Sequence, residues 1–195
     1  MSACEQFDRA AAEVQRVVDA VDEAGLTLPS PCSEWDVRAV VNHMVTGNLM
    51  FAAIMRGEPL PDQTADYLGA RPAEAFARSV SAFREASAQP GVLERGYPTP
   101  IGERPGEFMV HMRVNEIVVH GWDVAAATGQ STDLVADLAQ QALRMWRTRL
   151  AGQPRPQDGP FGPSGQRPAM PPRPTGWPRS SAGGHRSARA SMLRV

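Results

Sequence analysis

Residues 115–123 read Asn-Glu-Ile-Val-Val-His-Gly-Trp-Asp. Glu116 and His120 are four residues apart, which on a helix of about 3.6 residues per turn places both side chains on one face. Asp123 lies close to the line of Glu116. A carboxylate and an imidazole on successive turns form half of a divalent-metal site. The same spacing is also that of an ordinary surface pair or a buried hydrogen-bonded pair, and by itself it favours the ordinary pair.

The segment belongs to a predicted helix over residues 106–127, which the Thr-Gly pair that follows it terminates. Arg113 falls nearly in line with His120, two turns earlier. His111 is nine residues from His120 and therefore points to the opposite side, so we exclude it from any site built on this face. Ligand-type and core-type side chains share the face: Met109, Met112, Glu116, His120 and Asp123.

Four further helices follow from apolar residues that recur at three- and four-residue spacing. They are predicted over residues 4–24, 33–56, 72–88 and 132–150. Residues 92–106 are rich in turn formers and are expected to cross between helices, partly in extended conformation. Four or five antiparallel helices with moderate connections predict an all-α protein, a helix bundle.

The second of these helices contains a histidine on a mostly apolar face. Ser33 is the expected cap, with Asp36 three residues later at the positive end of the helix. His43 should point inward, which is most often the position of a core histidine with ordinary hydrogen-bond partners. Gly47, one turn later, is unfavourable in a helix and is expected to leave room for another group.

Composition limits the classes of protein to consider. The chain has 195 residues, enough for one domain with a proper core. Its two cysteines, Cys4 and Cys32, are too few for a disulfide framework or a cysteine-rich zinc site. No apolar run approaches the roughly 20 residues that span a bilayer, and no signal-peptide pattern is present. A soluble, cytoplasmic protein without a membrane partner is expected.

Charge divides the chain into two parts. Residues 1–150 hold 13 arginines and 20 acidic residues, whereas residues 151–195 hold 7 arginines and one acid. We therefore predict a helical domain over residues 1–151 and a disordered Pro/Arg/Gly-rich tail over residues 152–195. A basic tail of this kind can touch nucleic acid, but it carries no aromatic platform or folded motif, which argues against that function. Translation of GC-rich DNA in another reading frame would give the same composition.

Two separated motifs together resemble a known family. Residues 31–43 contain the pattern W-D-x-R-x-x-V-N-H, and residues 116–129 begin with E-x-x-x-H-G-W-D. Both are similar to the actinobacterial metal-binding proteins related to the N-terminal domain of mycothiol-dependent maleylpyruvate isomerase, within the DinB-like four-helix-bundle superfamily. The resemblance covers about residues 5–150 and implies a DinB-like four-helix bundle with an additional C-terminal helix. It also implies a divalent-metal site, usually zinc, with His43, Glu116 and His120 as ligands.

Three nitrogen and oxygen ligands leave one coordination position open, which is the pattern of a catalytic zinc site; nickel and iron are alternatives. The resemblance implies mycothiol or a similar low-molecular-weight thiol as cosubstrate and a small electrophilic substrate. Arg113 is assigned to an anionic substrate group, and Asp123 or Asp36 to the orientation of a ligand imidazole. Helix capping or a salt bridge is the alternative for each of these three residues.

Three other residues near the motifs are given structural roles. Trp35 and Trp122 are assigned to core packing, and Cys32 is read as a small connector residue with nothing nearby to make it a thiolate. The primary hypothesis is a thiol-dependent S-transferase that activates a thiol at the metal. The alternative is a non-catalytic metal-binding or regulatory module in which the ion is structural. A homodimer is an open alternative for the oligomeric state. Isomerase activity is not expected, because that enzyme has a further C-terminal domain for which this chain has no room.

Overall fold

The computed structural model describes residues 1–32, 35–99 and 102–150. The predicted tail, residues 152–195, lies outside these residues. None of the described helices is long and apolar enough to cross a membrane. In chain order the elements are α1 (Ala3–Asp19), α2 (Glu23–Leu26), α3 (Val37–Arg56), α4 (Pro72–Ser87), β1 (Gly96–Tyr97), β2 (Arg104–Pro105), α5 (Gly106–Ala127) and α6 (Ala136–Leu150).

The first predicted helix is divided in two. Helix α1 ends at Asp19, and α2 begins only at Glu23. Between them Asp22 has extended backbone geometry, and its side chain accepts a hydrogen bond from the Gly25 backbone N–H at 2.7 Å. An aspartate that caps a new helix offers the backbone an alternative to continuing the old one. The prediction of one helix over residues 4–24 is therefore wrong at its C-terminal end.

Helix α3 begins later than predicted. Its N-cap is Asp36, whose carboxylate accepts a hydrogen bond from the Ala39 backbone N–H at 2.8 Å. Ser33, the expected cap, lies outside the described residues. The helix ends at Gly57, which has φ 70° and therefore a left-handed conformation that favours glycine.

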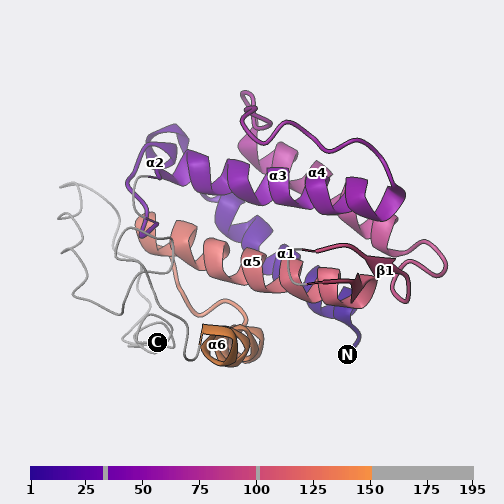
Figure 1. The fold of residues 1–195 in the computed structure, drawn as a ribbon. Helices are drawn as coiled ribbons and strands as arrows, with labels where there is room; N and C mark the ends of the chain where they lie inside the picture. The colour runs from indigo at the N-terminus through magenta and orange to yellow at the C-terminus, as the bar shows by residue number, and fades with distance from the viewer. Residues whose placement is uncertain (33–34, 100–101, 151–195) are drawn as a thin grey trace.

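The four long helices α1, α3, α4 and α5 form a bundle, and α6 lies next to α5 outside it (Figure 1). Helices α3 and α5 run antiparallel. Helices α3 and α4 run parallel, because Asn48 and Arg56 on α3 contact Ser79 and Glu85 on α4 in the same order. The expectation that all neighbours are antiparallel is wrong for this pair.

The long connection between α3 and α4 makes this parallel arrangement feasible. Residues 57–71 return along the length of α3 before α4 begins, which a stretch of that length can do. Two residues of the first motif hold the connection against α3. Arg38 bonds Asp66 at 2.6 Å, and Asn42 accepts a hydrogen bond from the Tyr67 backbone N–H at 2.9 Å. The presence of Arg38 and Asn42 in the motif is thus explained by these structural contacts alone.

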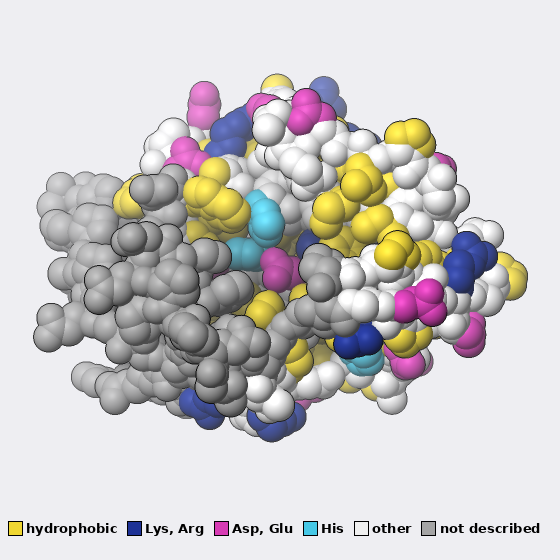
Figure 2. Space-filling view, viewed as in Figure 1, with side chains coloured by type: hydrophobic (Ala, Val, Ile, Leu, Met, Phe, Trp, Pro, Cys, Tyr) yellow, Lys and Arg dark blue, Asp and Glu magenta, His cyan; other side chains and the backbone are white. Residues whose placement is uncertain are grey.

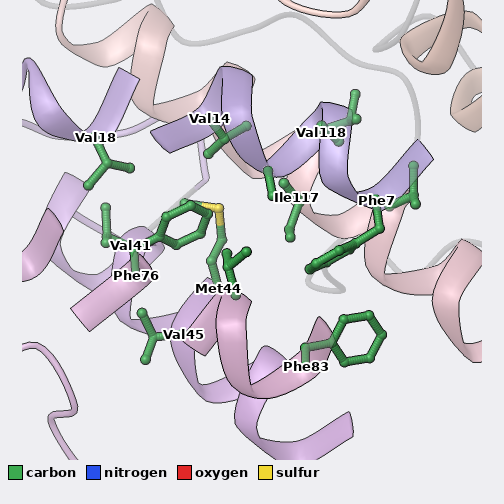
Figure 3. Packing of buried hydrophobic residues seen from close by; sticks show 14 of the residues in the cluster. Phe7, Val14, Val18, Val41, Met44, Val45, Phe76, Phe83, Ile117 and Val118 are labelled. Carbon is green, nitrogen blue, oxygen red and sulfur yellow. The ribbon is translucent and has the colours of Figure 1, made fainter. Parts of the chain in front are cut away.

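The core lies between the four helices and is filled by aliphatic and aromatic side chains (Figure 3). The Phe7 ring of α1 and the Phe83 ring of α4 have centroids 4.6 Å apart. Burial of one such side chain contributes about 1.5–3 kcal/mol. Gly121 on α5 lies against Val14 on α1, so a larger side chain at that position would meet Val14. Small residues therefore let α1 and α5 approach closely.

A short antiparallel pair of strands precedes α5. Gly96 pairs with Pro105 and Tyr97 with Arg104, which agrees with the expected partly extended crossover. The first turn of α5 rests on the preceding loop: Gly106 N–H donates to the Arg95 carbonyl at 3.0 Å. These contacts fix the position from which α5 starts.

Candidate metal centre

Helices α3 and α5 bring together the three residues predicted as metal ligands. Nε2 of His43 and Nε2 of His120 each lie 3.4 Å from the same carboxylate oxygen, Oε2 of Glu116. One donor atom from each residue lies within 4.8 Å of the others. The two imidazole rings meet edge to face, with centroids 4.8 Å apart. Residues far apart in the sequence thus present three donor atoms to one point.

The electrostatics of this cluster favour a positive charge at that point. Burial would raise the pKa of Glu116, but hydrogen bonds from His120 and His43 outweigh it and hold the pKa well below its usual range. Burial would lower the pKa of His120, yet its contacts with Asp123, Cys32 and Glu116 raise it to about 11. The carboxylate is therefore an anion between two imidazoles, an arrangement that a proton or a metal cation stabilises.

Asp123 contacts the other side of the His120 ring. Its Oδ2 lies 3.1 Å from His120 Nδ1, and its side chain is fully buried. Asp36, the alternative candidate for this role, caps α3 instead and is exposed. Of the two carboxylates considered, the structure therefore brings only Asp123 to a ligand-type imidazole.

Cys32, read from the sequence as a small connector residue, contacts two residues of α5. Its thiol donates to Asp123 Oδ2 at 3.4 Å, and its Sγ lies 3.9 Å from His120 Nδ1. Cys32, His120 and Asp123 form a second group with metal-ligand chemistry. The only signal in the sequence was the position of Cys32 inside the first motif, because no local spacing predicts its contact with α5.

Trp35 lies over the histidines. Its ring centroid is 4.9 Å from that of His43 and 6.2 Å from that of His120, and 38% of the residue is exposed. Assignment of Trp35 to the core is therefore wrong, whereas Trp122 is half-buried. An exposed indole beside imidazoles can cover whatever binds to them.

A pocket of about 370 Å³ opens beside the cluster, with His43 and Glu116 in its wall. The same face shows histidine and acidic side chains bordering a hollow that is flanked by apolar ones (Figure 2). Trp35, Met50, Phe51 and Met112 give the pocket apolar walls, and Asn42, Thr46 and Gln63 add polar groups. An apolar pocket with a few polar groups is the usual form of a small-molecule site.

Arg113 also lines this pocket but is almost fully buried, with 2% of its surface exposed. Its Nε and Nη2 donate to Asn48 Oδ1 at 3.2 and 3.0 Å, and Nη2 also donates to the Met44 carbonyl at 3.2 Å. Burial lowers the pKa of Arg113 to about 10. The guanidinium occupies the space that a side chain at Gly47 would fill, which explains the glycine inside α3.

The sequence did not reveal the network behind Arg113. Asn48 is fully buried, and its Nδ2 donates to Ser79 Oγ on α4 at 3.0 Å. Ser79 in turn donates to the Phe76 carbonyl at 2.7 Å. The signal in the sequence was the occurrence of polar residues at helix positions where the periodicity predicts apolar ones.

Residues 7–125 match the family described as mycothiol maleylpyruvate isomerase N-terminal domain. The chain belongs to this family. An uncharacterized protein of Mycobacterium tuberculosis is 35% identical over 133 residues, which are 68% of this chain and 71% of that protein. The same values hold for the H37Rv and CDC 1551 sequences. The expected family relation is thereby confirmed.

The fold of the family member mycothiol-dependent maleylpyruvate isomerase is similar. Its crystal structure superposes with a TM-score of 0.57 at 17% identity, covering 78% of this chain and 74% of that enzyme. The crystal structure of a mutant of that enzyme gives the same TM-score at 16% identity. This similarity confirms the DinB-like all-α fold.

Proposed function

We propose that the chain binds one divalent metal ion through His43, Glu116 and His120, with zinc as the first candidate and nickel or iron as alternatives. The observation that carries the proposal is the approach of two imidazole Nε2 atoms to one carboxylate oxygen, each at 3.4 Å. Tetrahedral ligands about 2.0–2.1 Å from zinc lie about 3.3 Å from one another. The two measured spacings match those of a tetrahedral zinc site, and the two imidazole nitrogens lie within 4.8 Å of each other, which supports the proposal.

Asp123 has a supporting role in this proposal. A carboxylate on the far nitrogen of a ligand histidine fixes the ring and raises its basicity. Oδ2 of Asp123 is 3.1 Å from His120 Nδ1, which leaves Nε2 directed at Glu116. Asp123 thus orients the imidazole and does not need to contact a substrate.

Asp123→Asn is expected to weaken metal binding by about 10- to 100-fold while one ion per chain still binds at saturation. The amide retains the size of the carboxylate but not its charge, so His120 becomes a poorer donor. Competition with a chromogenic chelator measures the change. Equal affinity of the variant and the wild type would contradict the role given to Asp123.

We further propose a thiol-dependent transferase reaction, because the solved relative is a mycothiol-dependent enzyme. When bound, a divalent ion supplies a positive charge that lowers the pKa of a nearby thiol. The chain itself would bind the electrophile in the pocket, shield it from water with the apolar walls and hold it near His43. Trp35, which covers the two imidazoles, would limit the access of water from outside.

The test is consumption of a low-molecular-weight thiol with a panel of small electrophiles, before and after removal of metal by a chelator. Turnover that disappears with the metal and returns when zinc is added supports the proposal. If the protein binds metal and loses thermal stability without it, yet turns over no electrophile, the ion has a structural role and the transferase proposal fails.

A further inference from the structure

One buried cation in the pocket is not explained by the metal centre. Arg113 lies one turn before Glu116 on α5 and is 2% exposed, whereas the side chains of His43 and Glu116 are 39% and 26% exposed. The pocket therefore has histidine and glutamate near its mouth and a guanidinium at its floor. In the described part of the chain no carboxylate forms an ion pair with Arg113, whose partners are neutral oxygens.

A positive charge in such a place is costly, because two neutral acceptors and one aromatic face replace little of its hydration. The Phe51 ring centroid is 5.5 Å from the guanidinium carbon. Packing alone does not require a cation there, since an uncharged side chain of the same length would fill the space beside Gly47. Asn48 is itself held by Ser79, so the guanidinium is fixed in one orientation.

This orientation leaves one nitrogen of the Arg113 guanidinium, Nη1, available to a ligand. Nε and Nη2 donate hydrogen bonds to Asn48 and Met44, whereas Nη1 makes no hydrogen bond to any described residue. Arginine binds planar carboxylates in its fixed fork geometry and is preferred for that purpose at desolvated sites. A preformed, partly satisfied guanidinium that lines a pocket has the properties of a receptor for one anionic group.

We propose that Arg113 is an anion subsite at the floor of the pocket and receives the carboxylate of the small molecule that binds there. The charge of Glu116 on the next turn acts on the guanidinium from a distance, but no described carboxylate is within ion-pair distance of it. The ligand carboxylate supplies that direct partner. The inference deepens the proposed function by naming a substrate class, and in that respect it rests on it. The subsite itself needs no metal.

The pocket also restricts the rest of the ligand. Met50, Phe51 and Met112 give it apolar walls, with polar groups from Asn42, Thr46 and Gln63, so most of the body attached to the carboxylate is apolar or unsaturated. Side chains three residues apart on a helix start about 5–6 Å from each other. A ligand anchored on Arg113 therefore presents an atom only a few bonds from its carboxylate to the region of Glu116 and His43.

The test compares benzoate with benzamide, which has the same shape but no charge, by calorimetry on the full chain. We expect benzoate to bind at least about 10-fold more tightly than benzamide. Arg113→Met, which keeps length and loses charge, should remove this preference. Arg78→Met on the exposed surface of α4 is the matched control and should keep it. Equal binding of both probes to the wild type, or no binding of either, overturns the proposal.

A carboxylate can also ligate a metal directly, and a chelator-treated sample separates the two sources of affinity. If the benzoate preference survives removal of metal and disappears in Arg113→Met, the subsite is supported even where the metal proposal fails. If the preference disappears with the metal and persists in Arg113→Met, benzoate binds the metal and the subsite is overturned, while the metal proposal stands.

Arg113→Met can fail to fold, because Arg113 is part of a buried network. In that case the subsite is tested by the melting temperature of the wild type, measured with and without metal. Benzoate that raises the melting temperature of metal-free protein at concentrations where benzamide does not supports the subsite. Equal shifts overturn it.

Discussion

Replacement of His43 or His120 with alanine is expected to reduce bound divalent metal from about one ion per chain to almost none. Both imidazoles face the same carboxylate oxygen, so loss of either leaves only two donors. The two donors that remain in either variant do not hold zinc in competition with buffer. Elemental analysis of purified and zinc-reconstituted protein measures the effect, and thiol turnover should be lost in the same variants.

His111→Ala is the matched control, because His111 is on the same helix but belongs to neither described group of ligand-type residues. It should keep the metal. Circular dichroism must show that all variants are helical. If stoichiometric metal survives in both the His43 and the His120 variants, the ion is bound elsewhere and the proposed site is wrong.

The same experiment separates the two ligand-type groups that share His120. Metal that is lost in His120→Ala but retained in His43→Ala would lie on the Nδ1 side of the ring, with Cys32 and Asp123. Cys32→Ser should then remove it. Under the proposal, Cys32→Ser keeps the metal, because the thiol contacts Asp123 on the far side of the ring.

The second large effect concerns the start of α5. Gly106→Ala is expected to destabilise the protein by about 3 kcal/mol, near the upper end for overpacking. A side chain at Gly106 would overlap the Val92 carbonyl and crowd Leu93, both backbone groups that cannot rotate away. The first turn of α5 would move off the loop and weaken the bond from Gly106 N–H to the Arg95 carbonyl.

Thermal unfolding should show this as a decrease of roughly 6–12 °C in melting temperature for a domain of this size. Glu107→Ala is the control, since Glu107 is exposed in the same turn and its removal should cost less than about 1 kcal/mol. A Gly106→Ala protein that melts with the wild type would show that α5 does not rest on the loop as described.

Local sequence chemistry was sufficient for much of the fold. The bounds of α5 were predicted as 106–127 and confirmed, because turn-forming residues precede it and Thr-Gly follows it. The bounds of α4 differ by one residue. The division between α1 and α2 was missed because the apolar spacing continues through it, while a single capping side chain, Asp22, decides it.

The sequence by itself determined which residues share a helix face, and therefore that Glu116 and His120 lie together. Their proximity needs only the helical repeat, which is set by backbone hydrogen bonds. The family resemblance added His43 to the pair, and the three residues do converge. Their function as metal ligands stays a prediction that the metal analysis above decides.

Only the tertiary structure decided how α3 and α5 face each other, and with it the surroundings of the site. The contact of Cys32 with Asp123, the position of Trp35 over His43 and the burial of Arg113 against Asn48 all cross between segments. Helical periodicity fixes the direction of a side chain around its own axis but not the offset or rotation of one helix against another. Those quantities come from packing of the whole core, in which a small residue such as Gly121 sets how closely α5 approaches α1.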